Sequence, residues 1–318
     1  MKLTRHSRPR AWLVAIAAVL LYGGTAAAAD LSVCIDRSSP TAAMDTRLAQ
    51  AVAQHEHAML QIHRFDGSGD DDGFDLDHFN KLAGHSCDLV LGFPIDADAH
   101  GAPPGLKASA PYGHTGFVLV TPRGSHVATL DQLAAGSNVA VTYQTTPNLY
   151  FIDHRQLIAD VQLSDEDSLR ALARHQVPAA MLWEPTVRRY LAGAGAHSGL
   201  QIHPLHEPHA NFNLVALYDA RHQAAAAAFE QAIIAIQASG HLTGLLAPYA
   251  RTGTIGPSRP TAGTARVGRG DRHIAHRCSG AAPRRMGGRK PHHDDDALPA
   301  LYTADQADLG QAKFRENC

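Results

Sequence analysis

The pattern of apolar and polar positions changes its period several times between residues 30 and 95. Three runs there have the composition and spacing of β-strands: residues 31–36, 59–65 and 87–93. Two runs between them have helical spacing: residues 41–53 and residues 74–83, the second of which ends at Gly84. Strands that alternate with helices in this order predict a parallel sheet with helices packed on its faces.

A second set of alternating elements begins near residue 121. Its predicted strands are residues 138–142, 161–163, 179–183, 200–203 and 213–218. Its helices have identifiable starts: Thr129 with Gln132, Pro147 after a short loop, Ser164 before an acidic first turn, and Glu184 with Pro185. A long alanine-rich helix over residues 220–238 and a shorter helix up to Tyr249 follow the last strand.

The order of these elements predicts an α/β protein with two lobes, each built on a parallel-rich sheet. Crossings of the chain near residues 120 and 213 would join the lobes as a two-stranded hinge. We therefore expect residues 30–120 with 213–250 to form the first lobe and residues 121–212 to form the second.

The two ends of the sequence differ from this globular part. A basic leader, an apolar core over residues 11–22 and small residues up to position 29 predict a signal peptide at residues 1–29 and export to the periplasm. An uncleaved membrane anchor is the alternative for this segment. Residues 251–297 are rich in Gly, Arg, Pro and Thr and predict a disordered linker. Helical patterning returns over residues 298–318.

Charge and cysteine content narrow the function classes. The chain has 28 Lys and Arg against 30 Asp and Glu, so no basic excess indicates a nucleic-acid partner. No segment after residue 29 has the length and apolar character of a membrane span. An oxidising compartment favours cysteine pairing. Cys34 and Cys87 lie on strands that we expect to be neighbours, where either a disulfide or two buried thiols fit the sequence.

Polar and aromatic residues follow several of the predicted strands. Ligands of open α/β sheets bind beyond the carboxyl ends of the strands, so we expect these residues to line one cleft between the lobes. The candidates are Asp36, Ser38, Ser39, Phe93, Tyr112, Thr115, Thr145, Thr146, Trp183 and Glu184. Tyr112 and Trp183 have the largest faces for ligand contact. The alternative is that each residue packs within its own lobe.

Metal and catalytic motifs are weak. His203, His206, Glu207 and His209 lie in a proline-containing segment whose spacing matches no standard zinc signature, so we expect a solvated loop and no metal. The run His292, His293 and Asp294–Asp296 fits a charged tail better than a metal site. The sequence has no Gly-x-Ser-x-Gly motif, phosphate loop or nucleotide fingerprint, so we expect a protein that is not an enzyme.

Five short signals, taken in order, resemble the type-2 periplasmic solute-binding proteins (family 3-like). They are residues 31–36 (LSVCID), 87–94 (CDLVLGFP), 111–120 (PYGHTGFVLV), 139–147 (VAVTYQTTP) and 182–185 (LWEP). More narrowly, the pair Cys34 and Cys87 and the Gly-Phe-Pro and Trp-Glu-Pro turns resemble the substrate-binding-like proteins associated with quinoprotein (PQQ-dependent) alcohol dehydrogenases.

This resemblance implies a non-catalytic accessory to a PQQ-dependent alcohol dehydrogenase electron-transfer system. Its implied partners are the dehydrogenase, its cytochrome c and a small-molecule ligand, with no cofactor bound by this chain. The alternative is a substrate-binding receptor of an ABC transporter for a small solute. Amino-acid-binding members of the wider family carry an arginine shortly before the Pro-Tyr loop, whereas this sequence has Lys107 there, which disfavours an α-amino acid ligand.

The last residues resemble a different family. Residues 302–318 are similar to the opening helix of a class I cytochrome c, up to the first cysteine of its haem-attachment motif. The motif itself, Cys-x-x-Cys-His, does not occur in this sequence, so we expect haem c only if the gene continues past Cys318. An electron carrier in such a gene and an ordinary amphipathic helix are the two interpretations of this segment.

Overall fold

The computed structural model describes residues 30–67, 76–99 and 101–257. Its strands are β1 (Asp30–Asp36), β2 (Met59–Phe65), β3 (Leu89–Asp96), β4 (Lys107–Ala108), β5 (Gly113–Pro122), β6 (Asn138–Thr142), β7 (Ile158–Gln162), β8 (Ala179–Trp183), β9 (Leu200–Pro204), β10 (Asn211–Tyr218) and β11 (Arg251–Thr252). Its α-helices are α1 (Ala42–Glu56), α2 (Leu76–Lys81), α3 (Asp165–Ala173), α4 (Glu184–Ala192), α5 (Gln223–Ala238) and α6 (Leu242–Leu246). Shorter 3₁₀ helices cover Leu130–Gln132, Thr146–Ile152 and Ala220–His222.

Two sheets share one long strand. The first sheet has the parallel order β2-β1-β3, followed by β10 and the beginning of β5, which run antiparallel to their neighbours. The second sheet has the parallel order β8-β6-β7, with β8 and β9 antiparallel to the end of β5. Both sheets are therefore parallel only in their outer part, because the strands that connect them bring antiparallel pairs with them.

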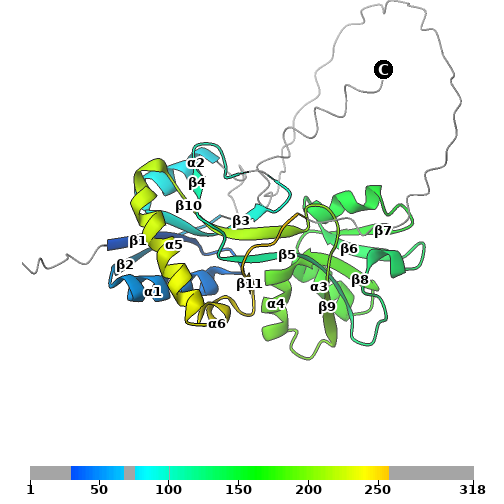
Figure 1. The fold of residues 1–318 in the computed structure, drawn as a ribbon. Helices are drawn as coiled ribbons and strands as arrows, with labels where there is room; N and C mark the ends of the chain where they lie inside the picture. Colours follow the sequence, from blue (N-terminus) through cyan, green and yellow to red (C-terminus); the bar gives the residue numbers. More distant parts are fainter. Residues whose placement is uncertain (1–29, 68–75, 100, 258–318) are drawn as a thin grey trace, which may run out of the picture.

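The connection between the sheets is a pair of adjacent antiparallel strands, β5 and β10 (Figure 1). Gly116 of β5 pairs with Asn211 of β10, and only four residues further along, Val120 of the same strand pairs with Ala180 of β8 in the second sheet. One strand thus crosses from sheet to sheet and a neighbouring strand brings the chain back, which confirms the α/β two-lobed fold class.

Each sheet is covered by helices that bury an apolar stripe. In the first sheet, Leu48 and Val52 of α1 and Phe229 and Ile233 of α5 belong to one buried cluster on a single face. The opposite face buries a second cluster around Phe79 of α2. In the second sheet, α3 and α4 cover one face, and the 3₁₀ helices Leu130–Gln132 and Thr146–Ile152 contribute to the cluster on the other.

Cys34 and Cys87 form a disulfide, with the sulfur atoms 2.07 Å apart and the Cα atoms 5.7 Å apart. This confirms the first of the two alternatives for these residues. Cys34 lies on β1 as predicted. Cys87 was predicted to lie within a strand over residues 87–93, but it lies two residues before β3. Asp88 donates its main-chain N–H to the carbonyl of Ser32 at 2.9 Å. The disulfide therefore joins β1 to the segment that leads into β3.

Several predicted boundaries differ from the structure, and two of the differences bring new contacts. The helix expected to end at Gly84 continues as a π-helical turn over Leu82–Ser86, and the guanidinium of Arg221 donates to the carbonyl of Gly84 at 2.5 Å. The linker predicted from residue 251 begins with a strand, because β11 pairs with the start of β5. The side chain of Asn213 then exchanges two hydrogen bonds with the main chain of Ile255.

The remaining predicted segments lie outside the described residues: the signal peptide at residues 1–29, the linker over 258–297 and the cytochrome-like helix over 298–318. Within the described ranges, no helix combines the length and the apolar character that crossing a bilayer requires.

Candidate functional site

A cavity of about 200 Å³ is lined by residues from both sheets. From the first sheet come the loop after β1, the middle of β3 and the start of α1. From the second come the loop after β6, the start of α3 and the end of β8. Phe117 of β5 and Phe212 of β10 add side chains from the connecting strands. The cavity therefore lies where the sequence placed a ligand, beyond the carboxyl ends of parallel strands.

Seven of the ten candidate residues line this cavity: Asp36, Ser38, Ser39, Phe93, Thr145, Thr146 and Trp183. Tyr112, Thr115 and Glu184 do not line it. The contacts of the seven with a ligand remain a prediction, whereas the contacts of the other three show other uses.

Tyr112 supports the cavity wall from behind. Its side chain is only 1% exposed, and its ring packs edge-on against Phe229 with the centroids 5.8 Å apart. Its hydroxyl accepts a hydrogen bond from the main-chain N–H of Gly92 at 2.8 Å, and Gly92 itself lines the cavity. Tyr112 was expected to contact a ligand directly, and it instead holds the backbone that does line the site.

Thr115 and Glu184 are used near the connection between the sheets. The hydroxyl of Thr115 donates to the carbonyl of Tyr249 at 3.3 Å. The Oε1 atom of Glu184 accepts from Arg188 at 2.8 Å and from Arg251 at 2.9 Å. Both polar groups are therefore occupied by partners within the protein.

A polar corner of the cavity is built on the loop after β1. Asp36 Oδ1 accepts hydrogen bonds from the main-chain N–H and the hydroxyl of Ser38, at 2.8 and 2.6 Å, and from the N–H of Gly67 at 2.9 Å. Ser39 and Thr41 have their hydroxyl oxygens 2.8 Å apart, and Thr41 donates to Asp45 Oδ2 at 2.7 Å. These bonds fix a carboxylate and a chain of hydroxyls at one end of the site.

Asp45 is a buried carboxyl group on this side of the cavity. Its residue is 1% exposed, and its Oδ1 atom has no hydrogen-bond partner among the described residues. Burial raises the pKa of Asp45 to about 7; the hydrogen bond from Thr41 opposes this effect, and the nearby charge of Asp36 adds to it. The group is therefore poised between its neutral and its charged form at neutral pH.

Asp165 is the corresponding carboxyl group on the second sheet. It is the first residue of α3, lines the cavity, and is 9% exposed. Burial raises its pKa to about 6, and the hydrogen bond donated by the hydroxyl of Thr142 opposes this effect. Two shielded carboxyl groups thus border one cavity from different sheets.

Aromatic rings make up much of the remaining wall. Trp183 stands edge-on to both Phe117 and Phe212, with centroid distances of 5.2 Å in each case, and the two phenylalanine rings are 5.8 Å apart. Phe79 and Phe93 lie 5.6 Å apart at the first sheet. All five side chains, together with Phe65, line the cavity.

None of the described residues that line the cavity is Lys, Arg or His. Lys107, the basic residue shortly before the Pro-Tyr loop, lies on β4 and donates to Gln223 at 3.0 Å. An anionic group bound here would have no cationic side chain to pair with. That the ligand is not an α-amino acid remains a prediction.

Sequence analysis missed Asp45 and Asp165. Asp45 is spaced three and four residues from the buried Leu48 and Ala49, so helical spacing places it on the inward face of α1. Asp165 was interpreted only as an acidic residue that suits the start of a helix. In both cases an acid on an otherwise apolar face was the available signal.

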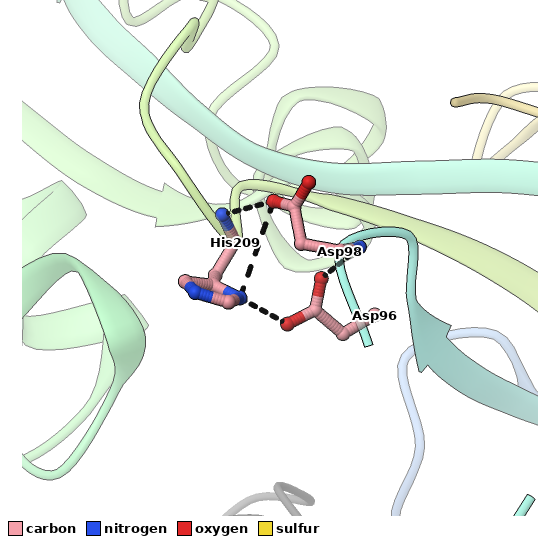
Figure 2. A group of neighbouring side chains, drawn as sticks. All are labelled: Asp96, Asp98 and His209. Atoms are coloured by element: carbon pink, nitrogen blue, oxygen red, sulfur yellow. Dashed lines mark hydrogen bonds and ion pairs between the residues drawn. The ribbon is translucent and has the colours of Figure 1, made fainter. Parts of the chain in front are cut away.

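One group of possible metal ligands lies outside the cavity. Asp96, Asp98 and His209 bring one oxygen or nitrogen atom each to within 4.8 Å of one another, as Figure 2 shows. We predicted a solvated loop around His209 from its neighbours in sequence. Asp96 and Asp98 come from a distant part of the chain, so that prediction did not include them.

Comparisons with known proteins identify the fold. No protein-family model matches the chain, and no curated protein matches it significantly. Among solved structures, the L-cystine solute receptor of Neisseria gonorrhoeae, in its unliganded open conformation, has a TM-score of 0.56 and 17% identity over 70% of this chain and 92% of its own. The substrate-binding domain 2 of GlnP from Lactococcus lactis has a TM-score of 0.56 and 13% identity over 70% and 96%.

A third similar structure is the second substrate-binding domain of a putative amino acid ABC transporter from Streptococcus pneumoniae, with a TM-score of 0.54 and 14% identity over 69% and 99%. At these identities the likeness concerns the fold alone. Nothing in the comparisons supports the narrower resemblance to quinoprotein-associated proteins or to a cytochrome c tail. The described part of this chain has the two-lobed fold of the type-2 solute-binding proteins.

Proposed function

We propose that this protein is a periplasmic receptor that captures a small organic cation with an apolar body and presents it to an ABC transporter. The observation that carries the proposal is the composition of the cavity wall: six aromatic rings and three aspartates, without a basic side chain among the described lining residues. The fold is shared with substrate-binding domains of transporters, and this supports a receptor over an enzyme.

The electrostatics of the wall favour a cation. Aromatic faces attract ammonium groups, and this attraction grows when the site is shielded from water. Asp45 and Asp165 both have raised pKa values because they are buried, so a bound cation would stabilise their charged forms and displace a proton. A carboxylate ligand would instead favour the neutral forms of Asp45 and Asp165 and would gain no charge pairing from them.

The size of the cavity favours a small solute. Its volume of about 200 Å³ is below the roughly 300–1,000 Å³ typical of sites for drug-sized ligands. The hydroxyls of Ser38, Thr145 and Thr146 supply a few hydrogen-bonding positions around an apolar interior. A compact amine with an aliphatic or aromatic body fits this balance of polar and apolar surface.

The transporter receptor is the alternative that the sequence left open, and it now has better support than the accessory role in a quinoprotein alcohol dehydrogenase system. The accessory role depended on a pair of cysteines and two short turns, and the solved structures that resemble this chain are solute receptors and transporter domains. The cysteine pair has a structural explanation in the first sheet.

A tryptophan titration tests the proposal. The sequence has two tryptophans, one of them within the predicted signal peptide, so Trp183 is the only one in the predicted mature chain. We expect saturable fluorescence changes and thermal stabilisation with quaternary ammonium compounds or primary amines that carry an apolar group. Dicarboxylates and simple sugars should have no effect. Stabilisation of about 2.7 kcal/mol is expected at a ligand concentration of 100 times the Kd.

A matched pair of variants locates the binding. Asp165→Asn removes a carboxylate of the cavity wall and should weaken amine binding at least tenfold, whereas Asp153→Asn removes an exposed carboxylate outside the cavity and should leave it unchanged. Binding of dicarboxylates in preference to amines, or equal affinities for both variants, would refute the cationic ligand. A complete absence of binding to a broad solute panel would refute the receptor itself.

A further inference from the structure

A cluster of three side chains lies beside the strands that connect the two sheets. Asp96 is the last residue of β3 and pairs with Phe212 of β10, and Asp98 lies in the turn that follows. His209 lies two residues before β10, in the segment that returns from the second sheet. The cluster therefore joins parts of the chain that are more than a hundred residues apart in sequence.

The three side chains converge on one point (Figure 2). His209 Nδ1 lies 2.6 Å from Asp96 Oδ2 and 4.0 Å from Asp98 Oδ2, and one atom of each residue falls within a 4.8 Å group. Ligand atoms about 2.1 Å from a tetrahedral zinc ion lie about 3.4 Å apart. Shifts of about 1 Å would thus bring the three atoms to coordinating positions.

Main-chain hydrogen bonds hold this arrangement. Asp98 Oδ2 accepts the main-chain N–H of His209 at 2.5 Å, and the N–H of Asp98 donates to Asp96 Oδ1 at 2.8 Å. The side chains of Asp96 and Asp98 are 16% and 14% exposed, while that of His209 is 46% exposed. An ion can therefore enter from the solvent on the imidazole side, and water can complete its coordination.

A buried hydroxyl supplies an independent indication of a ligand. Tyr150 is 5% exposed, and its hydroxyl has no hydrogen-bond partner within the described ranges. Burial raises the pKa of this phenol, and the charges of Glu207, Asp96 and Asp98 raise it further, which places the hydroxyl in the field of the cluster. Buried polar groups in proteins almost always have a partner, and a water held by an ion would provide one.

We propose that Asp96, Asp98 and His209 bind a divalent transition ion of the zinc or manganese class, through two carboxylate oxygens and Nδ1. An imidazole beside two carboxylates suits these ions, whereas magnesium and calcium prefer ligand sets of oxygen alone. None of the three residues lines the cavity, so the ion does not depend on the solute proposed above. By joining β3 to the returning segment, it stabilises the connection between the sheets.

The test uses the full chain, stripped with a chelator, dialysed and titrated with zinc chloride against a chromophoric competitor. We expect one tightly bound zinc per chain and a melting temperature several degrees higher at a hundredfold excess over the Kd. His209→Ala and Asp98→Asn should each lower the affinity at least tenfold. His206→Ala, an exposed histidine of the same loop, should bind as the unaltered chain does.

The tail run His292 and His293 requires its own control, because it is a second source of imidazole. The double variant His292→Ala/His293→Ala should still bind one zinc ion tightly per chain. Three results would overturn the proposal: loss of tight zinc binding in that double variant, unchanged tight binding in His209→Ala, or no tight zinc binding by the unaltered chain. Metal-free melting curves show whether each variant folds, and Asp96→Asn replaces Asp98→Asn if the latter does not.

Discussion

Glu184 Oε1 lies 2.9 Å from the guanidinium of Arg251, and this contact joins α4 to β11. Glu184 begins α4 directly after β8 of the second sheet, whereas β11 pairs with the start of β5 in the first sheet. The carboxylate also accepts from Arg188, and its side chain is only 5% exposed. The pair therefore ties the two halves of the molecule together beside the connecting strands.

Breaking this contact should destabilise the protein measurably. Glu184→Gln leaves two guanidinium groups without their charged acceptor, and we expect a loss of about 2 kcal/mol in the free energy of unfolding. Arg251→Ala should cost about 1 kcal/mol, because its side chain is half exposed. Urea unfolding of the two single variants and the double variant should give a coupling energy of about 1 kcal/mol.

The matched control is the ion pair between Arg189 and Glu166, whose side chains are both nearly half exposed. Arg189→Ala should change the free energy of unfolding by less than about 0.5 kcal/mol. Equal costs for Arg189→Ala and Arg251→Ala would mean that the shielded carboxylate of Glu184 contributes nothing beyond an ordinary surface pair.

Local patterns predicted most of the elements. The alternation at residues 59–65 gives β2 with the predicted bounds, and Ser164 caps α3 through its hydroxyl, which accepts from the N–H of Asp167. These features depend on neighbours in sequence, so the sequence contains them. The two-stranded connection could also be anticipated, because the predicted elements form a first sheet, cross to a second near residue 120 and return near residue 213.

Local sequence patterns could not predict the contacts between distant segments. Tyr112 was expected in the cavity because it is large and follows a Pro, yet its hydroxyl is taken up by Gly92, twenty residues away. Asp96 and His209 meet through the antiparallel register of β3 and β10, which no sequence period fixes. Side-chain chemistry was enough to select seven residues that line the cavity, whereas the hydrogen-bond partners of each side chain depend on the three-dimensional arrangement.

Removing the disulfide should destabilise the first sheet. Cys34 and Cys87 are separated by 53 positions, and closing a loop of that length lowers the entropy of the unfolded chain by an amount worth about 4 kcal/mol. We expect Cys34→Ala/Cys87→Ala to lose about 2–4 kcal/mol in urea unfolding. Reducing agent should lower the stability of the unaltered chain and leave that of the double variant unchanged. If reducing agent lowers the stability of the unaltered chain and of the double variant equally, the effect comes from the other cysteines.

A methyl group at Gly92 should be more damaging than the same change at another turn. Gly92 has a φ of +78°, and a Cβ atom there would overlap the carboxylate of Asp45. Gly124 has a similar φ of +89° with open space around the added atom. Gly124→Ala should cost about 1 kcal/mol for the backbone alone, and Gly92→Ala about 2–4 kcal/mol. Similar melting temperatures for the two variants would show that Asp45 moves aside freely.

The buried carboxyl of Asp45 should make stability fall as the pH rises. Its pKa is about 7 in the folded protein against 3.8 for an unperturbed aspartate, so between these values the folded state holds a proton that unfolding releases. The stabilisation is complete below about pH 4 and is lost as the pH rises through 7. At 1.36 kcal/mol for each pKa unit, the full span amounts to about 4 kcal/mol.

Asp45→Asn isolates this effect, because the amide keeps an acceptor for Thr41 and cannot ionise. We expect the variant and the unaltered chain to have similar free energies of unfolding near pH 4.5, and the variant to be more stable by about 1–4 kcal/mol at pH 8. Urea titrations at pH 4.5, 6 and 8 measure this difference. Asp153→Asn, at an exposed position, should show a difference that does not change with pH. If the difference in free energy of unfolding between Asp45→Asn and the unaltered chain does not change with pH, the carboxyl of Asp45 is ionised in the folded protein at every pH tested. A cation already bound beside Asp45 would have this effect.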